Sequence, residues 1–283
     1  KIIKLSEGKS YLEGGLWWME EGGSIGDFYG YKNLGVFQYD ESNAFSDKWE
    51  QLTPVFENGV FAYKYLLNGS DYSGTVNVKK LPNGKAFRGG DYNWAEIGGE
   101  ENGIIDDNDK MVIGNAMPKY TGGLSTQVRY KQVTLFVSFY YSLGGKIYND
   151  AEHNRNAFRF TGTTPSPKVI HDLWLKQGDI SNYPRPYNDE FNNARYANSF
   201  YLEDGSYIRL QNVRMSYEFE KEILKKLRLK GLSIYGYINN PLTWTKYSGY
   251  DPEFSSSNPL QIGKDTYRYP MKREFGLGLN INI

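Results

Sequence analysis

The chain has 283 residues, of which 33 are basic and 33 are acidic, and it contains no cysteine. The balanced charge argues against a nucleic-acid partner, and the absence of cysteine excludes a disulfide framework, a thiolate metal site and a cysteine nucleophile. Aromatic residues make up 16% of the chain, including 25 tyrosines, and glycine occurs 31 times. This composition is too apolar for a disordered chain, so we expect a folded protein.

Hydropathy excludes a transmembrane helix but not every kind of membrane protein. No window of about 18 apolar residues occurs, and the mean hydropathy is -0.63. A barrel strand crosses a membrane with about 9 to 11 residues, of which only every second one is apolar, and barrel girdles are rich in aromatic residues. The abundance of tyrosine and glycine is compatible with such a barrel.

The first 118 residues show little regular alternation. Lys1–Leu5 is a candidate for a short strand, and Gly-Gly pairs begin at positions 14, 22, 89 and 98. Glycine pairs interrupt regular strands, because glycine has no side chain to pack and permits unusual backbone angles. We interpret residues 10–118 mainly as one elaborated excursion on the long-loop side of the fold.

The clearest strand covers Val133–Leu143, where apolar side chains occupy every second position and one face is wholly apolar. The preceding stretch, Leu124–Tyr130, alternates in the same way. Only Lys131 and Gln132 separate the two stretches, and this spacing predicts an antiparallel hairpin.

A long connection follows over residues 144–205. Within it, Pro165–Gly178 begins with proline and ends with glycine, which predicts a short helix. The next strand, Ser206–Phe219, changes phase: its apolar residues lie at even positions before Gln211 and at odd positions after Asn212. An inserted residue would produce this change, so we expect a bulge or bend there.

Two further strands are predicted, over Leu232–Ile238 and Phe275–Ile283. The segments that connect them to the preceding strands differ in length. Lys221–Lys230 has five basic residues in ten and is interpreted as a solvated turn, whereas residues 240–271 form a long connection. Short and long joins therefore alternate along the chain, which is typical of outer-membrane barrels with short periplasmic turns and long extracellular loops.

Four segments resemble the SusC/RagA family of TonB-dependent outer-membrane transporters. They occur in the family's order and near its spacing, and they are Ser24–Phe37, Ile105–Leu124, Leu202–Val213 and Asn240–Glu253. The resemblance spans essentially the whole chain, but it covers only the C-terminal part of such a transporter.

The resemblance implies an all-β fold. Residues 1–283 would form the C-terminal part of a large transmembrane antiparallel β-barrel of the 22-stranded type, with long extracellular loops. The N-terminal plug and the TonB-contacting segment would lie outside this sequence. The five strands counted here cannot close a barrel, and open sheet edges are not tolerated in lipid, so we expect strands outside this sequence to complete it.

The resemblance also implies a function: TonB-dependent import of a nutrient oligomer, a glycan or a peptide, across the cell outer membrane. A SusD-like surface lipoprotein would cover the barrel mouth, the TonB complex would act through the missing N-terminal part, and membrane lipid would surround the wall. From the residues alone, a soluble β-sandwich that binds glycan is the alternative. An enzyme is not expected, because the chain has only two histidines and lacks the common catalytic motifs.

Aromatic residues in the long connections are candidate substrate contacts, because aromatic rings can stack on sugars or hold peptide side chains. The candidates are Trp174, Tyr183, Tyr187 and Tyr196. The same residues could instead form a loop core or an interfacial belt.

By resemblance, residues 98–109 correspond to a loop that holds a cation in the manner of an EF-hand. Calcium takes roughly six to eight oxygen ligands. The candidate ligands are Glu100, Asn102, Asp106 and Asp109 through their side chains and Ile104 through its backbone oxygen. The first ligand position is occupied by Gly98, so an acidic turn without a metal is the alternative, and Glu96 or Glu100 would have to supply the missing carboxylate.

Overall fold

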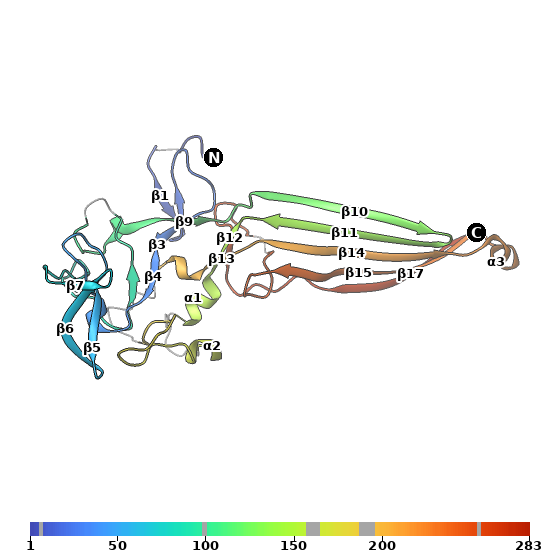
Figure 1. The fold of residues 1–283 in the computed structure, drawn as a ribbon. Helices are drawn as coiled ribbons and strands as arrows, with labels where there is room; N and C mark the ends of the chain where they lie inside the picture. Colours follow the sequence, from blue (N-terminus) through green and yellow to red (C-terminus); the bar gives the residue numbers. More distant parts are fainter. Residues whose placement is uncertain (6–7, 98–100, 157–164, 187–195, 254–255) are drawn as a thin grey trace. The chain divides into compact units, whose positions relative to one another are not determined.

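The computed structural model describes residues 1–5, 8–97, 101–156, 165–186, 196–253 and 256–283. The chain is built mainly of β-strands, with a few short helices (Figure 1). It divides into two compact units, the first made of Lys1–Asn115 with Asn149–Leu202 and the second of Ala116–Tyr148 with Glu203–Ile283. None of the described helices is long and apolar enough to cross a membrane.

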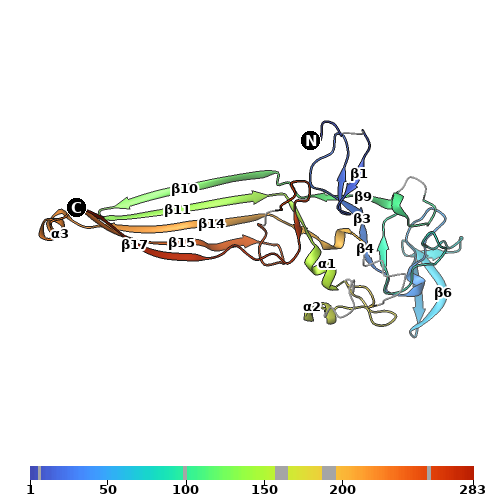
Figure 2. The same ribbon diagram turned by 180° about the vertical axis from the view of Figure 1, so that it is seen from behind.

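The second unit contains a five-stranded antiparallel sheet in the order β10-β11-β14-β15-β17. Its strands are β10 (Tyr120–Tyr130), β11 (Val133–Leu143), β14 (Tyr207–Glu218), β15 (Gly231–Thr245) and β17 (Glu274–Asn282). Each strand pairs with the next long strand along the chain, so the sheet is an up-and-down meander (Figures 1 and 2). Within this sheet, β10 and β17 are the edge strands.

The structure confirms the strands expected in this half of the chain. β11 has the bounds that the alternation predicts, and β10 pairs with it along its whole length from Tyr130 opposite Val133. The hairpin closes through Lys131, which adopts a left-handed backbone conformation with φ 53°. β15 continues to Thr245, which lies in the region expected to be a long connection.

The phase change in β14 is a β-bulge, as predicted. On both sides of β14 the pairing passes from Leu210 to Asn212 and leaves out Gln211. The opposing irregularity on β15 contains Asn240, with φ 50°, and Pro241. A proline has no N–H for a sheet ladder, so a bulge is one of the few interior positions that can hold it.

Smaller elements complete the second unit. A three-stranded sheet has the order β13 (Leu202–Asp204), β12 (Lys146–Asn149) and β16 (Lys264–Asp265). Between β14 and β15, the basic stretch expected to be a solvated turn forms helix α3 (Lys221–Leu227). This helix ends at Arg228, which is in the left-handed conformation typical of helix C-termini.

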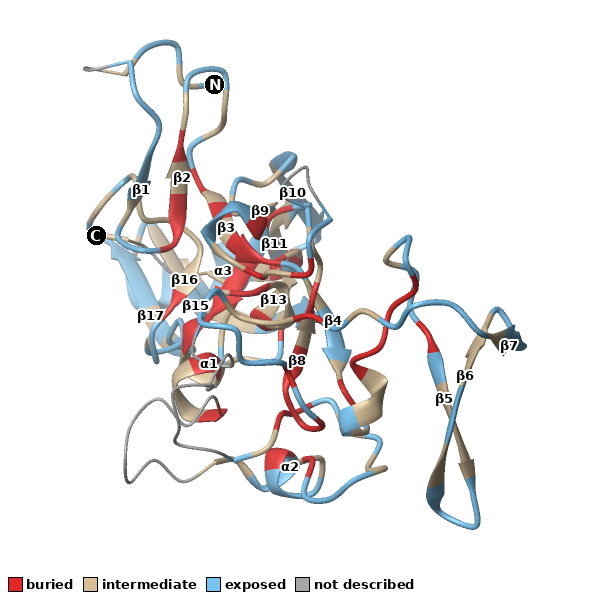
Figure 3. Cartoon of the chain, turned by 90° about the vertical axis from the view of Figure 1, so that its left-hand side faces the viewer, coloured by how far each residue is buried: buried red, intermediate tan, exposed pale blue. Residues whose placement is uncertain are grey.

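The first unit is assembled from short strands. One sheet contains β1 (Tyr11–Glu13), β2 (Trp17–Met19), β3 (Asp27–Tyr31) and β9 (Lys110–Asn115). A second sheet pairs β4 (Asn33–Val36) with β8 (Tyr92–Trp94). A third contains β5 (Thr53–Glu57), β6 (Val60–Leu67) and β7 (Ser70–Tyr72). The helices of the first unit are η1 (Asp40–Ser42), η2 (Asp107–Asp109), α1 (Asp150–Asn156), α2 (Pro167–Ile170) and η4 (Ser199–Tyr201). Buried residues are concentrated on β2, β3 and β8 (Figure 3).

One expectation for this unit was wrong, and another was right only in part. Lys1–Leu5 forms no strand; Ile2 exchanges backbone hydrogen bonds with the glycines at 22 and 23, but the pairing extends no further as a ladder. The helix expected over Pro165–Gly178 is only the four residues of α2. After α2, the N–H of Trp174 donates to the backbone oxygen of Tyr183. This tertiary hydrogen bond takes the place of a hydrogen bond within a helix.

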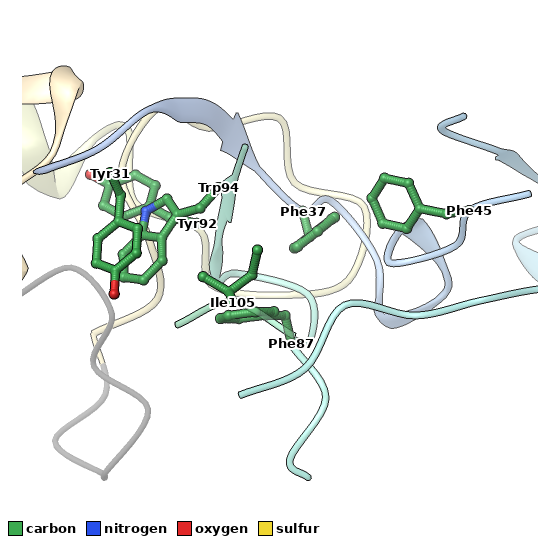
Figure 4. Close-up of a cluster of buried hydrophobic side chains, with 7 residues drawn as sticks. All are labelled: Tyr31, Phe37, Phe45, Phe87, Tyr92, Trp94 and Ile105. Carbon is green, nitrogen blue, oxygen red and sulfur yellow. The ribbon is translucent and has the colours of Figure 1, made fainter. Parts of the chain in front are cut away.

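Aromatic side chains from distant parts of the sequence form the core of the first unit (Figure 4). The core residues are Tyr31, Phe37, Phe45, Phe87, Tyr92, Trp94 and Ile105. The rings of Tyr31 and Trp94 stack with their centroids 4.1 Å apart. Lys79 lies at the edge of this core, where its Nζ donates to the backbone oxygen of Trp94 at 2.6 Å. Burial lowers the pKa of Lys79 to about 8, although Glu96 and Asp109 oppose the shift.

One glycine in β3 permits a close backbone approach. The N–H of Tyr31 donates to the oxygen of Ala197 at 2.9 Å, and a Cβ added to Gly30 would lie 2.3 Å from that oxygen. The segment that carries Tyr196 therefore lies against β3 only because residue 30 has no side chain.

Gly30→Ala is expected to push this segment away from β3 and to lower the free energy of local opening by about 1–3 kcal/mol. The measurement is amide hydrogen exchange of the peptide that contains Tyr31, which should become faster. Gly231→Ala is the matched control, because its Cβ would meet Asn282 at an ordinary 3.4 Å. Unchanged exchange in Gly30→Ala would contradict this account.

Candidate functional site

The five-stranded sheet has one continuous apolar face. In one row across the sheet, Val133 opposes Tyr217, Tyr217 opposes Ile234, and Ile234 opposes Leu279. Many side chains of this face are exposed, including Leu124, Val128, Val133, Leu135, Met215, Tyr217, Ile234, Ile238, Phe275, Leu277, Leu279 and Ile281. Leu277 is 86% exposed. Single exposed apolar residues are ordinary, but a patch of this extent marks a surface that meets another apolar phase or partner.

The opposite face of the same sheet is polar and aromatic. Arg214 lies over the ring of Tyr235 at 4.0 Å from its centroid, and Arg129 pairs with Glu218 at 2.5 Å. The ring of Tyr235 covers Gly278 on the neighbouring strand so closely that a Cβ there would lie 2.2 Å from it. The glycines that alternate with apolar residues in β17 therefore make room for tyrosine rings from β15.

A buried arginine ties the loop after β15 to the sheet. Arg209 of β14 is 1% exposed, and its guanidinium contacts Asp251 at 2.5 Å and Glu253 at 3.3 Å. Asp251 also accepts a hydrogen bond from the N–H of Met271 at 2.9 Å, which reaches the far end of the same loop. Two of the segments that carry the resemblance, Leu202–Val213 and Asn240–Glu253, are thus joined by a buried ion pair.

Two of the aromatic residues proposed from sequence to contact substrate are largely buried. Trp174 and Tyr183 are each 7% exposed and adjoin one another through the backbone. The indole N–H of Trp174 donates to the backbone oxygen of Gln38 at 2.9 Å, and the ring of Tyr183 packs edge-on against Phe200. Substrate contact by these two residues stays a prediction, and Tyr187 lies outside the described residues.

Tyr196, the fourth candidate, lies apart from that pair. It is 49% exposed, and its ring meets the stacked rings of Tyr31 and Trp94 edge-on, at centroid distances of 6.0 and 5.7 Å. These three rings line a cavity of about 370 Å³ together with the acidic residues Asp106 and Asp107. The structure therefore brings a candidate aromatic residue together with part of the candidate cation loop.

The oxygens of the acidic loop mainly accept backbone hydrogen bonds. Both carboxylate oxygens of Asp109 accept N–H groups, from Ile97 and Asp106 at 2.9 Å each. Glu96 accepts the N–H groups of Asn102 and Gly103 through one oxygen.

Asn102 and Glu96 of this loop differ in how their side-chain oxygens are used. Asn102 accepts the N–H of Ile104 at 2.7 Å, and the second oxygen of Glu96 is buried without a hydrogen-bond partner. Among the described residues, no group of three His, Cys, Asp or Glu could hold a metal ion, and Glu100 lies outside them. Calcium binding stays a prediction.

Sequence reasoning missed several residues of these sites. Tyr31 and Trp94 line the cavity but lie in the irregular first third of the chain, where no alternation marks them. Tyr31 lies within a segment that carries the resemblance, which was the only available signal. Arg209 occupies an ordinary strand position, and its partners are 42 and 44 residues away in sequence, so its burial could not be inferred from spacing.

Comparison with known proteins finds similar TonB-dependent receptors. No protein-family model matches the chain. It is 38% identical over 285 residues to TonB-dependent receptor P39 of Formosa agariphila, covering 100% of this chain and 27% of that receptor. It is 25% identical over 191 residues to TonB-dependent receptor SusC of Bacteroides thetaiotaomicron, covering 64% of this chain and 17% of SusC.

Solved structures show the same fold. The structure of the RagAB peptide transporter matches with a TM-score of 0.62 and 17% identity, over 96% of this chain and 24% of that chain. The RagAB peptide importer in its open-open state matches with a TM-score of 0.60 and 19% identity, over 99% of this chain and 25% of that chain.

The fold and the matches thus define the class: a mainly β-stranded segment whose matched relatives are TonB-dependent receptors, not enzymes. The chain belongs to the TonB-dependent receptor family that includes SusC. It spans about a quarter of the length of the first relatives to which it was matched.

The ion pair of Arg209 generates a prediction. Removing one member of a buried ion pair leaves an uncompensated charge and costs about 3–5 kcal/mol. Arg209→Met should therefore release the loop over residues 246–273, and limited proteolysis followed by mass spectrometry should show cleavage there at least about tenfold faster.

Arg129→Met is the matched control, because it removes an arginine whose side chain is 57% exposed and paired with Glu218. Exposed ion pairs contribute little, so this variant should be cleaved like the wild type. Equal cleavage of the two variants would show that Arg209 does not anchor the loop.

Proposed function

We propose that this chain forms part of the barrel wall and loops of an outer-membrane transporter that imports a nutrient oligomer with energy from TonB. Membership of the TonB-dependent receptor family supports the proposal. The observation that carries it is the apolar face of the five-stranded sheet, because an exposed apolar face beside a polar one is the pattern of a strand between lipid and lumen.

The edges of this sheet support a larger barrel. β10 and β17 each pair on one side within the sheet, and lipid offers no partner for their remaining N–H and C=O groups. Strands from the rest of the receptor would satisfy them, and the chain corresponds to about a quarter of its relatives. We propose that residues 1–283 are the C-terminal part of a barrel of the 22-stranded type, with the plug and TonB-contacting segment elsewhere in the receptor.

The alternative, a soluble β-sandwich that binds glycan, accounts less well for this face. In a sandwich, the apolar faces of two sheets pack together about 10 Å apart and are buried. Here Phe275 and Leu277 are each 86% exposed. A lipid environment would cover these side chains without a second sheet.

The partners follow from the family. A SusD-like lipoprotein would cover the mouth of the barrel on the outer surface, and the long connections over residues 144–205 and 240–271 would face it and the cargo. The cargo would be an oligosaccharide or a peptide, and the similar RagAB structure is that of a peptide transporter. Of the three aromatic candidates that the structure describes, Tyr196 is the one whose exposure best suits cargo contact.

Two adjacent residues on β17 test the orientation of the wall. Leu279 lies on the apolar face and is 57% exposed, whereas Asn280 lies on the polar face near Ser233. A charge on the lipid face costs about 2–4 kcal/mol at the bilayer midplane, and a charge toward the lumen costs little. In the full-length receptor, Leu279→Arg should therefore reduce assembly in the outer membrane, and Asn280→Arg should not.

The measurement is the amount of heat-modifiable receptor in isolated outer membranes for each variant. If both variants assembled like the wild type, the apolar face would not meet lipid, and the proposal would fail. A defect in Asn280→Arg alone would reverse the assignment of the two faces.

A further inference from the structure

The cavity in the first unit combines aromatic rings with carboxylates. Tyr31 and Trp94 form one stacked pair, Tyr196 meets both edge-on, and Asp106 and Asp107 complete the lining. The indole nitrogen of Trp94 is buried without a hydrogen-bond partner. A concave site with aromatic walls and a few convergent polar groups is the usual form of a ligand pocket.

The charges in this cavity are not balanced internally. Asp107 pairs with Lys110 at 2.7 Å, and the ammonium of Lys110 lies over the ring of Tyr31 at 5.4 Å from its centroid. The arrangement shows that a cation is compatible with this aromatic surface. Asp106 accepts the N–H of Asn108 at 2.7 Å and the side-chain amide of the same residue, but no lysine or arginine in the described part of the chain pairs with it.

The two carboxylates that line the cavity, Asp106 and Asp107, give it a negative field, which Lys110 offsets by pairing with Asp107. Such a field disfavours anionic ligands and favours cationic ones.

We propose that this cavity binds a cationic side chain, an ammonium or guanidinium group, on the transported cargo. Asp106 would accept its charge-assisted hydrogen bonds, and the ring of Tyr196, which is 49% exposed, would provide cation–π contact. The inference rests on the proposed import function and deepens it, because it selects a peptide with lysine or arginine over a neutral glycan.

A neutral glycan fits these observations less well. Its hydroxyl groups would gain no Coulomb attraction from the unpaired carboxylate of Asp106. Two of the three rings, Tyr31 and Trp94, already use one face each against the other at 4.1 Å, which reduces the flat surface left for a sugar ring. A cation needs only to approach a ring face or carboxylate within a few ångströms.

Isothermal titration of the purified full-length receptor tests this inference. The probes are N-acetyl-Gly-Arg-Gly-amide and the same peptide with citrulline, a neutral isostere, in place of arginine. The arginine peptide should bind at least about tenfold more tightly, and the difference should shrink as salt is raised. In Asp106→Asn the preference should fall to about twofold or less, and Tyr196→Ala should weaken binding of the arginine peptide.

The variants are chosen to preserve the fold. Asparagine can replace Asp106 as the residue that caps η2, and Tyr196 is half exposed. Asp47→Asn removes an exposed carboxylate elsewhere in the same unit and should bind like the wild type.

Equal affinity for the two peptides, no measurable binding of either, or an undiminished preference in Asp106→Asn would overturn the inference. Binding of maltoheptaose that is lost in Tyr196→Ala would overturn it in favour of a sugar site. Failure of the import function would appear separately, as receptor-dependent cargo uptake by cells that is unchanged when TonB is deleted. If uptake depended on TonB but Asp106→Asn kept the full preference for the arginine peptide, only the cavity inference would be overturned.

Discussion

The alternation of apolar and polar side chains along five strands is the constraint on which the second unit depends. A strand directs successive side chains to opposite faces, so this sequence produces one face of aliphatic and aromatic groups and another of tyrosine, arginine, asparagine and glycine. Exposure of the first face to water is unfavourable, and the unpaired backbone groups of the edge strands require hydrogen-bond partners. The proposed wall between lipid and lumen would satisfy both requirements.

Local irregularities keep that alternation intact over long strands. The bulge at Gln211 inserts one residue and so returns Val213 and Met215 to the face that holds Leu210. Arg209 lies just before the bulge on the opposite face, where its ion pair with Asp251 holds the following loop. The same short stretch of β14 therefore sets both the register of the five-stranded sheet and the position of a loop.

The five-stranded sheet of the second unit could be predicted because its information is local. The period of two, the hairpin at Lys131 and the phase change at Gln211 are visible in neighbouring residues. The first unit could not be predicted in this way, because it depends on contacts between residues far apart in the sequence, such as Gly30 and Ala197. Tyr196 and Asp106 were each named from sequence, but only the fold shows that they line one cavity.

Site-directed spin labelling tests the central claim, the orientation of the sheet, most directly. The chain itself has no cysteine, so labels can be placed at Ile238→Cys on the apolar face and at Tyr237→Cys on the polar face of the receptor in lipid bilayers. Oxygen concentrates in lipid and a nickel chelate in water. The account predicts that oxygen relaxes the label at 238 more strongly and the chelate relaxes the label at 237 more strongly. Equal access of the chelate to both positions would contradict it.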